Sequence, residues 1–263
     1  MTDDLAANAP LVTQDAFLGG RLWLRQPARG FRAGVDAVLL AAAVPGDVGH
    51  SVRVLDAGAG VGTAGLCLAR RCPDAHVVLL ERDPGLACLA ADNIVLNELT
   101  SRARVMQADL LAPAGELEAL GLKPASFEHV IANPPFHDEA AGTPAAGVQK
   151  AMANAMRGGT FSGWARCLAR VTCADGTATL IHKAEALAEV LDGLNGRFGA
   201  LRVLPIAPRP GTPAIRILVH GRKGSRAPLS LLSPFVLHGA SGHGFTQQAE
   251  AILKQGAGLP IVG

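Results

Sequence analysis

Residues 52–62 read Val52-Arg53-Val54-Leu55-Asp56-Ala57-Gly58-Ala59-Gly60-Val61-Gly62. The apolar start predicts a buried strand, and the glycines after it predict a sharp turn into a helix. A turn of this kind lets the backbone approach a ligand closely at the N-terminus of the helix. The region therefore predicts a strand, a ligand-binding loop and a helix in succession.

The residues of this loop narrow the choice of ligand. Gly58, Gly60 and Gly62 are spaced Gly-x-Gly-x-Gly, because Thr63 stands where the dinucleotide fingerprint needs its third glycine. Asp56 precedes the glycines, and its carboxylate disfavours a pyrophosphate but suits a cationic group. We expect an ammonium or sulfonium ligand, with an ordinary glycine turn as the alternative.

Strand-like and helix-like segments alternate along most of the chain. Strands are expected at 52–55, 76–80, 104–106, 127–132 and 178–182, and helices at 84–97, 163–171 and 185–194. This alternation is typical of an α/β fold with a doubly wound, Rossmann-like sheet that is mostly parallel. Near the C-terminus, the strands expected at 201–206 and 215–220 are joined by a short segment rich in proline. Such a link favours an antiparallel hairpin.

The regions around this core suggest a division of the chain. We expect residues 1–50 to form an extension packed on the core, with a small hairpin strand at 17–25 and a short helix at 37–44. Residues 51–240 are expected to form the main domain, and 241–263 a C-terminal helix and tail. The polar segment 138–160 is long enough to be a mobile lid.

Composition limits where the protein works. The chain has no run of about 18 apolar residues, which a membrane span would need. Its polar start, Met1 to Asp4, is unlike a signal peptide, and its five cysteines contain no Cys-x-x-Cys pair. We therefore expect a cytoplasmic protein with reduced thiols. His129, His137 and His182 have no partners at metal-ligand spacing, so no metal site is expected.

Charge is distributed unevenly. Residues 151–263 carry 12 Lys and Arg but only 5 Asp and Glu, and no acidic residue lies between Asp192 and Glu250. An imbalance of this kind favours a polyanionic partner such as RNA, although a solvated surface is the alternative. The residues expected to contact RNA phosphates are Arg209, Arg216, Arg222, Lys223 and Arg226.

Polar residues follow three further strands of the predicted sheet. Glu81 follows the second strand, where a carboxylate can accept both hydroxyls of a ribose. Asp109 follows the third strand, where it can accept from an adenine amine. Either residue could instead cap a helix, as could Asp83. Because the strands are parallel, these groups should converge with the glycine loop on one crevice.

Asn133-Pro134-Pro135-Phe136 follows the fourth strand. The two prolines stop the strand and leave the Asn133 amide and the Phe136 ring directed beyond its end. An amide acceptor beside an aromatic face can hold a flat group that carries an amino nitrogen.

With these motifs, residues 30–185 resemble the class I S-adenosylmethionine-dependent methyltransferases. The resemblance implies that the loop from Asp56 to Gly62 holds the methionine end of that cofactor, Glu81 its ribose and Asp109 its adenine. In that family the Asn and the first Pro carbonyl of the tetrapeptide accept hydrogen bonds from the target amine, and the aromatic residue stacks on the base. These roles would fall to Asn133, Pro134 and Phe136.

Residues 30–40 and 216–232 look like the corresponding segments of bacterial tRNA-valine adenine-N6-methyltransferases. This resemblance implies methylation of an adenine in tRNA, and it allows Asp36 to lie near the cofactor or to cap a helix. Because His137 follows Phe136, the motif also resembles that of ribosomal RNA guanine-N2-methyltransferases. A protein glutamine N5-methyltransferase and a non-catalytic RNA-binding protein are further alternatives.

Overall fold

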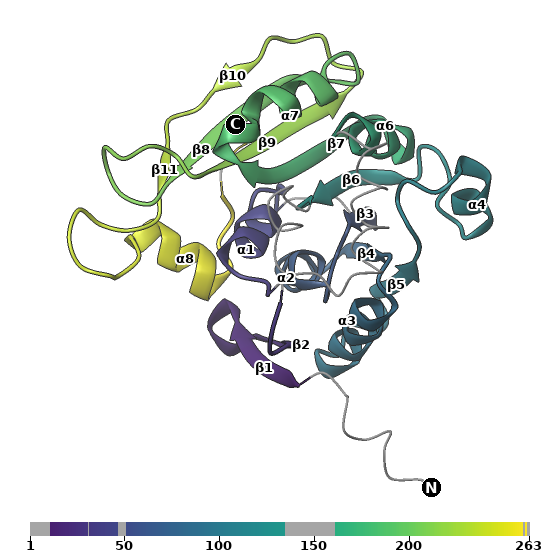
Figure 1. The fold of residues 1–263 in the computed structure, drawn as a ribbon, viewed down its shortest axis with the longest axis horizontal. Coiled ribbons are helices and arrows are strands. Elements are labelled where there is room, and N and C mark those ends of the chain that lie inside the picture. Colours follow the sequence, from purple (N-terminus) through teal and green to yellow (C-terminus); the bar gives the residue numbers. More distant parts are fainter. Residues whose placement is uncertain (1–10, 31, 47–50, 135–160, 260, 262–263) are drawn as a thin grey trace, which may run out of the picture.

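The computed structural model describes residues 11–30, 32–46, 51–134, 161–259 and 261. They form one nine-stranded sheet, a separate hairpin and helices on both faces of the sheet (Figure 1). The strands are β1 Val12–Phe17, β2 Leu22–Pro27, β3 Val52–Ala57, β4 Ala75–Glu81, β5 Ala103–Gln107, β6 Phe127–Ala132, β7 Thr172–Lys183, β8 Phe198–Ala207, β9 Arg216–Lys223, β10 Ser230–Leu231 and β11 Phe235–Val236. The helices are η1 Leu18–Gly20, α1 Val35–Ala42, α2 Thr63–Arg71, α3 Pro84–Leu96, α4 Ala114–Ala119, α6 Phe161–Val171, η3 Ala184–Ala186, α7 Leu187–Leu194 and α8 Gln247–Gln255.

The sheet has the strand order β10-β8-β9-β7-β6-β3-β4-β5, and β11 also pairs with β8. Strands β3 to β7 are mutually parallel, whereas β9 runs antiparallel to both β7 and β8. This arrangement confirms the doubly wound, mostly parallel sheet and its antiparallel C-terminal hairpin. The link between β8 and β9 is too short for a crossover, so the chain reverses there.

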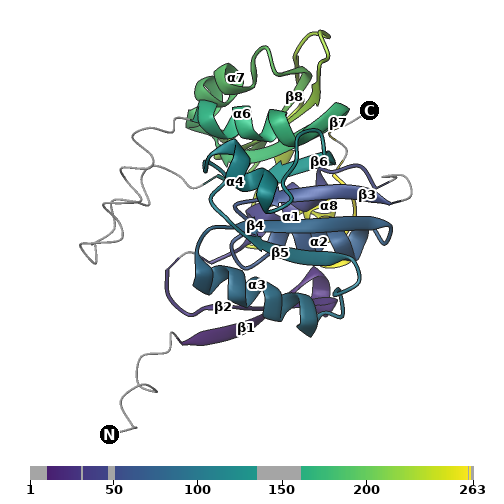
Figure 2. The ribbon, with the colours of Figure 1, turned by 90° about the vertical axis from the view of Figure 1, so that its right-hand side faces the viewer.

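Both faces of the sheet are buried, which explains why its strands are apolar runs rather than alternating ones. Val54 and Leu79 pack with α1, α2 and α8 in one core cluster. Leu55 and Leu80, one residue further along each strand, pack with α4, α6 and α7 in the other. Figure 2 shows α4, α6 and α7 together on one side of the sheet.

Several elements differ from the expected ones. Residues 17–25 do not form one strand, because Gly19 and Gly20 take positive φ values of 65° and 88° and turn the chain between β1 and β2. Helix α1 is preceded by Gly34, so Asp36 lies in its first turn and does not cap it. The short elements α4, β10 and β11 were not expected, and the segment 138–160 lies outside the described residues.

Within the described ranges, no helix combines the length and apolar character of a membrane span. In the same ranges, no three His, Cys, Asp or Glu side chains lie close enough together to hold a metal ion.

Asn93 on α3 and Asn97, which caps the C-terminus of that helix, attach the N-terminal hairpin to the core. Asn93 Oδ1 accepts a hydrogen bond from the backbone N–H of Arg25 at 2.7 Å, and its Nδ2 donates to the carbonyls of Arg25 and Val61 at 2.9 and 3.0 Å. Asn97, one turn later, bonds in the same way to the N–H and carbonyl of Trp23. These side chains pair with the β2 backbone as a neighbouring strand would, so β2 lies beside α3 (Figure 1).

We expect the substitution Asn93→Ala to lower the free energy of unfolding by about 3 kcal/mol, because it leaves three backbone groups of β2 and the glycine loop without partners. Asp92→Ala, on the exposed side of the same helix, is the control and should change stability by less than about 0.5 kcal/mol. Urea denaturation of both variants checks this. Equal stabilities would show that the asparagine contacts do not hold the hairpin.

Candidate functional site

The carboxyl ends of four parallel strands meet at one edge of the sheet. Ala57, the last residue of β3, lies opposite Leu80 on β4 and Ala132 on β6, and Glu81 lies opposite Gln107 on β5. The structure therefore places the glycine loop, Glu81, Asp109 and Asn133 beyond the ends of neighbouring strands, at the position where such sheets bind ligands.

The glycine loop, residues 58–62, needs its glycines for two reasons. Gly58, Gly60 and Gly62 have φ values of 71°, 57° and 88°, and this left-handed region is costly for other residues. A Cβ atom at Gly58 would lie 2.8 Å from Trp164, and one at Gly62 would lie 2.8 Å from Leu79. At Gly60, by contrast, nothing lies within 4 Å of an added Cβ. The loop thus packs tightly at its ends and is open at its centre, where a ligand can approach.

The N–H groups of the loop bind protein acceptors. Those of Gly58 and Ala59 both donate to the carbonyl of Leu80 at 2.9 Å, and that of Gly60 donates to Glu81 Oε2 at 2.8 Å. These donors are therefore occupied, whereas a pyrophosphate site needs its donors directed at the ligand. The geometry supports the expectation that the ligand is not a dinucleotide.

Glu81 is only 8% exposed and binds the backbone of the glycine loop and of the turn before α3. Its Oε2 binds Gly60, and its Oε1 accepts from the N–H of Asp83 at 2.8 Å. Capping of α3 falls to Asp83, which accepts from the N–H of Leu86. Each oxygen of Glu81 keeps a second acceptor position, so the carboxylate can also bind hydroxyl groups.

Asp56 lies beneath the loop and is 2% exposed. Its Oδ2 accepts a hydrogen bond from the N–H of Gly65 at 2.8 Å. Burial raises the pKa of Asp56 to about 7, against the opposing effect of the Gly65 N–H, and the nearby charge of Glu81 raises it further. Through this bond Asp56 holds the start of α2 directly after the loop, and the ligand contact expected of Asp56 stays a prediction.

Asp109 combines a structural bond with an accessible oxygen. Its Oδ1 accepts from the N–H of Leu111 at 2.8 Å, so it stabilises the turn that follows β5. Its Oδ2 lies 3.8 Å from the guanidinium of Arg82, and the side chain is 41% exposed. Asp109 therefore stabilises the local turn, as the structural alternative proposed, and its Oδ2 can still accept a hydrogen bond from an amine.

Asn133 stands out because its Oδ1 is buried and no described residue donates a hydrogen bond to it. An unpaired buried acceptor of this kind costs about 1–3 kcal/mol, so native proteins seldom keep one without a use. Pro134 is buried beside it. Pro135, Phe136 and His137 lie outside the described residues, so the stacking expected of Phe136 stays a prediction.

Trp164 packs against the core and also reaches the glycine loop. This residue of α6 is half-buried, and the space that a Gly58 Cβ would occupy lies 2.8 Å from its Cη2 atom. Helical periodicity places Trp164 on the inner side of α6 but does not show that this side reaches the glycine loop.

The residues expected to bind RNA are divided between opposite edges of the sheet. Arg216 begins β9 opposite Lys183, the last residue of β7, so it lies at the edge that carries the glycine loop. Arg222 lies opposite Thr177, towards the start of β7, and Lys223 follows it. Arg209, just after β8, belongs with Arg216, and Arg226 follows Lys223 in the chain. The structure therefore divides these five cations between two edges of the sheet, and their contact with RNA phosphates stays a prediction.

Some of these arginines also have partners from distant parts of the chain. Arg216 Nε donates to Asp36 Oδ2 at 2.7 Å, which joins the start of β9 to α1. Arg209 donates to the carbonyls of Gly239 and Gly242 and so holds the loop before α8. Although Asp and Glu are scarce in the C-terminal sequence, Arg209 and Arg216 have hydrogen-bond partners elsewhere in the chain.

We expect Asp56→Asn to gain stability over the unaltered protein as the pH rises from about 4 to 7. The raised pKa means that folding takes up a proton, so the stability that Asp56 contributes is full below its unfolded pKa and is lost as the pH rises through about 7. The difference should grow by up to about 1.4 kcal/mol per pH unit and then level off. Urea denaturation of both proteins from pH 4 to 8 measures this difference. If the stability of both proteins changes in parallel with pH, the pKa of Asp56 is not raised.

Comparison with known proteins gives consistent results. Residues 33–162 match the family described as "Methyltransferase small domain". A tRNA1(Val) (adenine(37)-N6)-methyltransferase from Bacteroides thetaiotaomicron is 28% identical over 190 residues, which cover 72% of this chain and 75% of that protein. The protein of the same name from Yersinia pestis is 28% identical over 220 residues, covering 80% of this chain and 82% of the other.

Solved structures give the same family. One described as a predicted O-methyltransferase from Agrobacterium tumefaciens is 32% identical, with a TM-score of 0.72, and the likeness covers 85% of this chain and 98% of that one. A tRNA methyltransferase from Aquifex aeolicus, 14% identical with a TM-score of 0.52 over 76% of this chain and 72% of that one, shares the fold. Because the first likeness extends over almost the whole of its counterpart, the chain belongs to the class I S-adenosylmethionine-dependent methyltransferases.

Proposed function

We propose that the protein transfers a methyl group from S-adenosylmethionine to an exocyclic base amine in RNA, and specifically to N6 of an adenine in tRNA. The observation that carries this proposal is the buried Asn133 Oδ1, which no described residue satisfies, at the strand end beside the glycine loop. The relatives named tRNA1(Val) (adenine(37)-N6)-methyltransferase support the choice of base and of RNA.

The described residues fit the cofactor. The loop is open at Gly60, its buried carboxylates favour a cationic ligand, and Glu81 can accept further hydrogen bonds from hydroxyl groups. We assign the methionine end to the glycine loop, the ribose to Glu81 and the adenine amine to Asp109. S-adenosylmethionine supplies an electrophilic methyl group on a sulfonium, whose departure leaves a neutral thioether.

Asn133 and Pro134 prepare the acceptor. An exocyclic base amine is a poor nucleophile because its lone pair is delocalised into the ring. When Asn133 Oδ1 and the Pro134 carbonyl accept hydrogen bonds from its two N–H groups, the nitrogen becomes more pyramidal. Its lone pair then points at the methyl group. Because the leaving group is neutral, catalysis consists mostly of positioning. We assign stacking of the target base to Phe136.

An amine acceptor fits the site better than a hydroxyl, although the Agrobacterium protein is described as an O-methyltransferase. A hydroxyl has one hydrogen and needs a base to remove it, whereas two adjacent acceptors match the two hydrogens of an amino group. The buried carboxyl groups of Asp56 and Glu81 already accept hydrogen bonds from the N–H groups of Gly65, Gly60 and Asp83.

The substrate can be identified directly. Purified protein incubated with labelled S-adenosylmethionine and total RNA from a strain lacking the gene should label tRNA, and digestion should release N6-methyladenosine. Label only in N2-methylguanosine of ribosomal RNA, only in a protein glutamine, or only on a hydroxyl group would refute the proposal. Absence of transfer to any acceptor would indicate a protein that keeps the fold without catalysis.

We expect Asn133→Ala to lower kcat/KM for RNA methylation by at least about 100-fold, because it removes a positioned acceptor that acts on the reacting nitrogen. Cofactor affinity, measured by calorimetry, should change little. Asn133→Asp is the matched control, since it keeps an acceptor of the same shape, and it should retain more activity than the alanine variant. Near-normal turnover of Asn133→Ala would show that this mechanism is wrong.

A further inference from the structure

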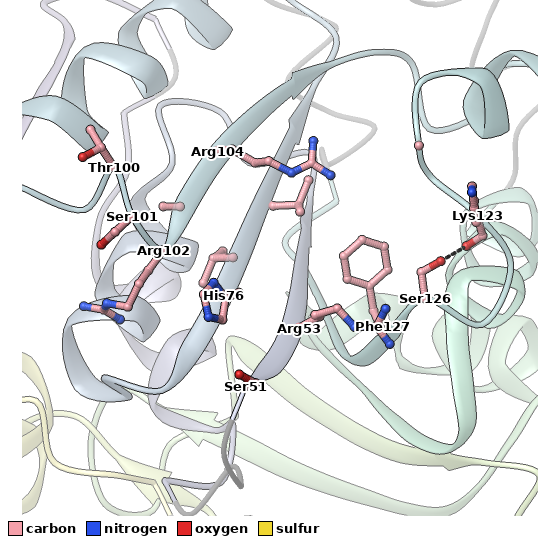
Figure 3. A pocket seen from close by; sticks show the side chains of 14 residues that line it. Ser51, Arg53, His76, Thr100, Ser101, Arg102, Arg104, Lys123, Ser126 and Phe127 are labelled. Carbon is pink, nitrogen blue, oxygen red and sulfur yellow. Dashed lines mark hydrogen bonds between the residues drawn. The ribbon is translucent and has the colours of Figure 1, made fainter.

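A hollow of about 740 Å³ lies at the opposite edge of the sheet, where β3, β4 and β5 begin (Figure 3). Arg53 on β3 lies opposite His76 on β4, and Val78 lies opposite Arg104 on β5. Because residues two apart share a face, these four side chains lie on one face of the sheet. Apolar packing on that face starts with Leu55 and Val78, so polar side chains occupy its uncovered end.

The lining of this hollow suits an anion. Its cationic side chains and its histidine are Arg53, Arg102, Arg104, Lys123 and His76. Its hydroxyl groups are those of Ser51, Thr100, Ser101 and Ser126. No Asp or Glu is among the residues that line it in the described part of the chain. Guanidinium, ammonium and hydroxyl groups together are what phosphate oxygens bind.

Two of these cations are not used by the fold. Arg53 forms an ion pair with Glu128 at 2.7 Å, and Arg102 donates to the carbonyl of Ala69 at 2.8 Å, so both have structural roles. The side chains of Arg104 and Lys123, by contrast, form no hydrogen bond or ion pair with a described residue and are exposed. Figure 3 shows both among the side chains that line the hollow, with Phe127 between them in this view. An exposed pair without protein partners can bind a ligand without breaking existing contacts.

The positive charge continues past the hollow along the same edge. Lys223 Nζ donates a hydrogen bond to the carbonyl of Thr172, which lies opposite Phe127, a residue that lines the hollow. Arg222 lies beside Lys223 at the end of β9, with Asp175 at 3.2 Å. We call this set the amino-edge belt; it comprises Arg53, His76, Arg104, Lys123, Arg222, Lys223 and Arg226.

We propose that the amino-edge belt binds the phosphate backbone of the substrate RNA at a point remote from the methylated base. The inference rests on the proposed function for the identity of the polyanion. From β5 to β9 the belt crosses five strand spacings of about 4.8 Å, or roughly 24 Å. A single nucleotide would need donors that converge on one point, whereas a line of separated cations matches a chain of phosphates.

The two edges can be reached by one RNA molecule. A strand of six residues, such as β3, is about 20 Å long, so this distance separates the belt from the glycine loop. A folded RNA can present its target base at one edge and its backbone at the other. The belt then supplies affinity that depends on salt but not on sequence.

The test uses the double variant Arg104→Glu, Lys123→Glu and, as a control with the same change in charge, Arg25→Glu, Arg29→Glu on the exposed side of the hairpin. We expect the belt variant to weaken binding of full-length substrate tRNA at least 10-fold, measured by fluorescence anisotropy. The slope of log K against log salt should fall by about 1.5, as two lost phosphate contacts predict. Cofactor affinity, measured by calorimetry, should stay unchanged, which shows that the variant is folded.

Different outcomes overturn different claims. Unchanged tRNA affinity in the belt variant, or an equal loss in the hairpin control, would overturn the belt while leaving the proposed function intact. Competition by pyrophosphate at concentrations that match the tRNA would identify a small phosphate compound as the ligand instead of RNA. Absence of tRNA binding by the unaltered protein would overturn both the belt and the proposed function.

Discussion

The glycine loop and the first turn of α2 after it are held by hydrogen bonds to side chains of three different elements. The N–H of Gly65 in α2 donates to Asp56 on β3, the N–H of Gly60 donates to Glu81 on β4, and Asn93 on α3 donates to the carbonyl of Val61. Each partner is buried, so each bond also satisfies a polar group that would be costly to leave unpaired. Hydrogen bonds therefore connect the loop to the ends of the two central strands and, through Asn93, to the N-terminal hairpin.

The same bonds set the electrostatics of the site. The carboxyl groups of Asp56 and Glu81 take up the N–H groups of Gly65 and Gly60, so this end of the strands favours a cation over a phosphate. At the other end of the same strands, Arg53 and Arg104 line the hollow, and Arg53 is paired there with Glu128. The same strands therefore carry carboxyl groups at one end and cationic side chains at the other.

Much of the fold was readable because its strands are buried on both faces and its turns carry glycine or proline. The parallel core strands and the reversal between β8 and β9 were predicted on that basis. Strands of two residues, such as β10 and β11, are too short to show an alternation of apolar and polar residues. In the site, Glu81, Asp109 and Asn133 could be found because each follows an apolar strand. Trp164 could not, because helical spacing does not specify which neighbour a side chain meets.

The sequence by itself determined the succession of the core strands and helices along the chain. It also determined the glycines that take left-handed backbone conformations and the polar residues at the strand ends. These are local properties, since they depend on side-chain period and backbone sterics. The tertiary structure alone decided that Asp56 lies beneath the loop, that Asp36 binds Arg216, and that the C-terminal cations divide between two edges. The C-terminal cations are divided because β9 runs antiparallel between β7 and β8. Arg216 at its start and Lys223 at its end therefore lie at opposite edges of the sheet.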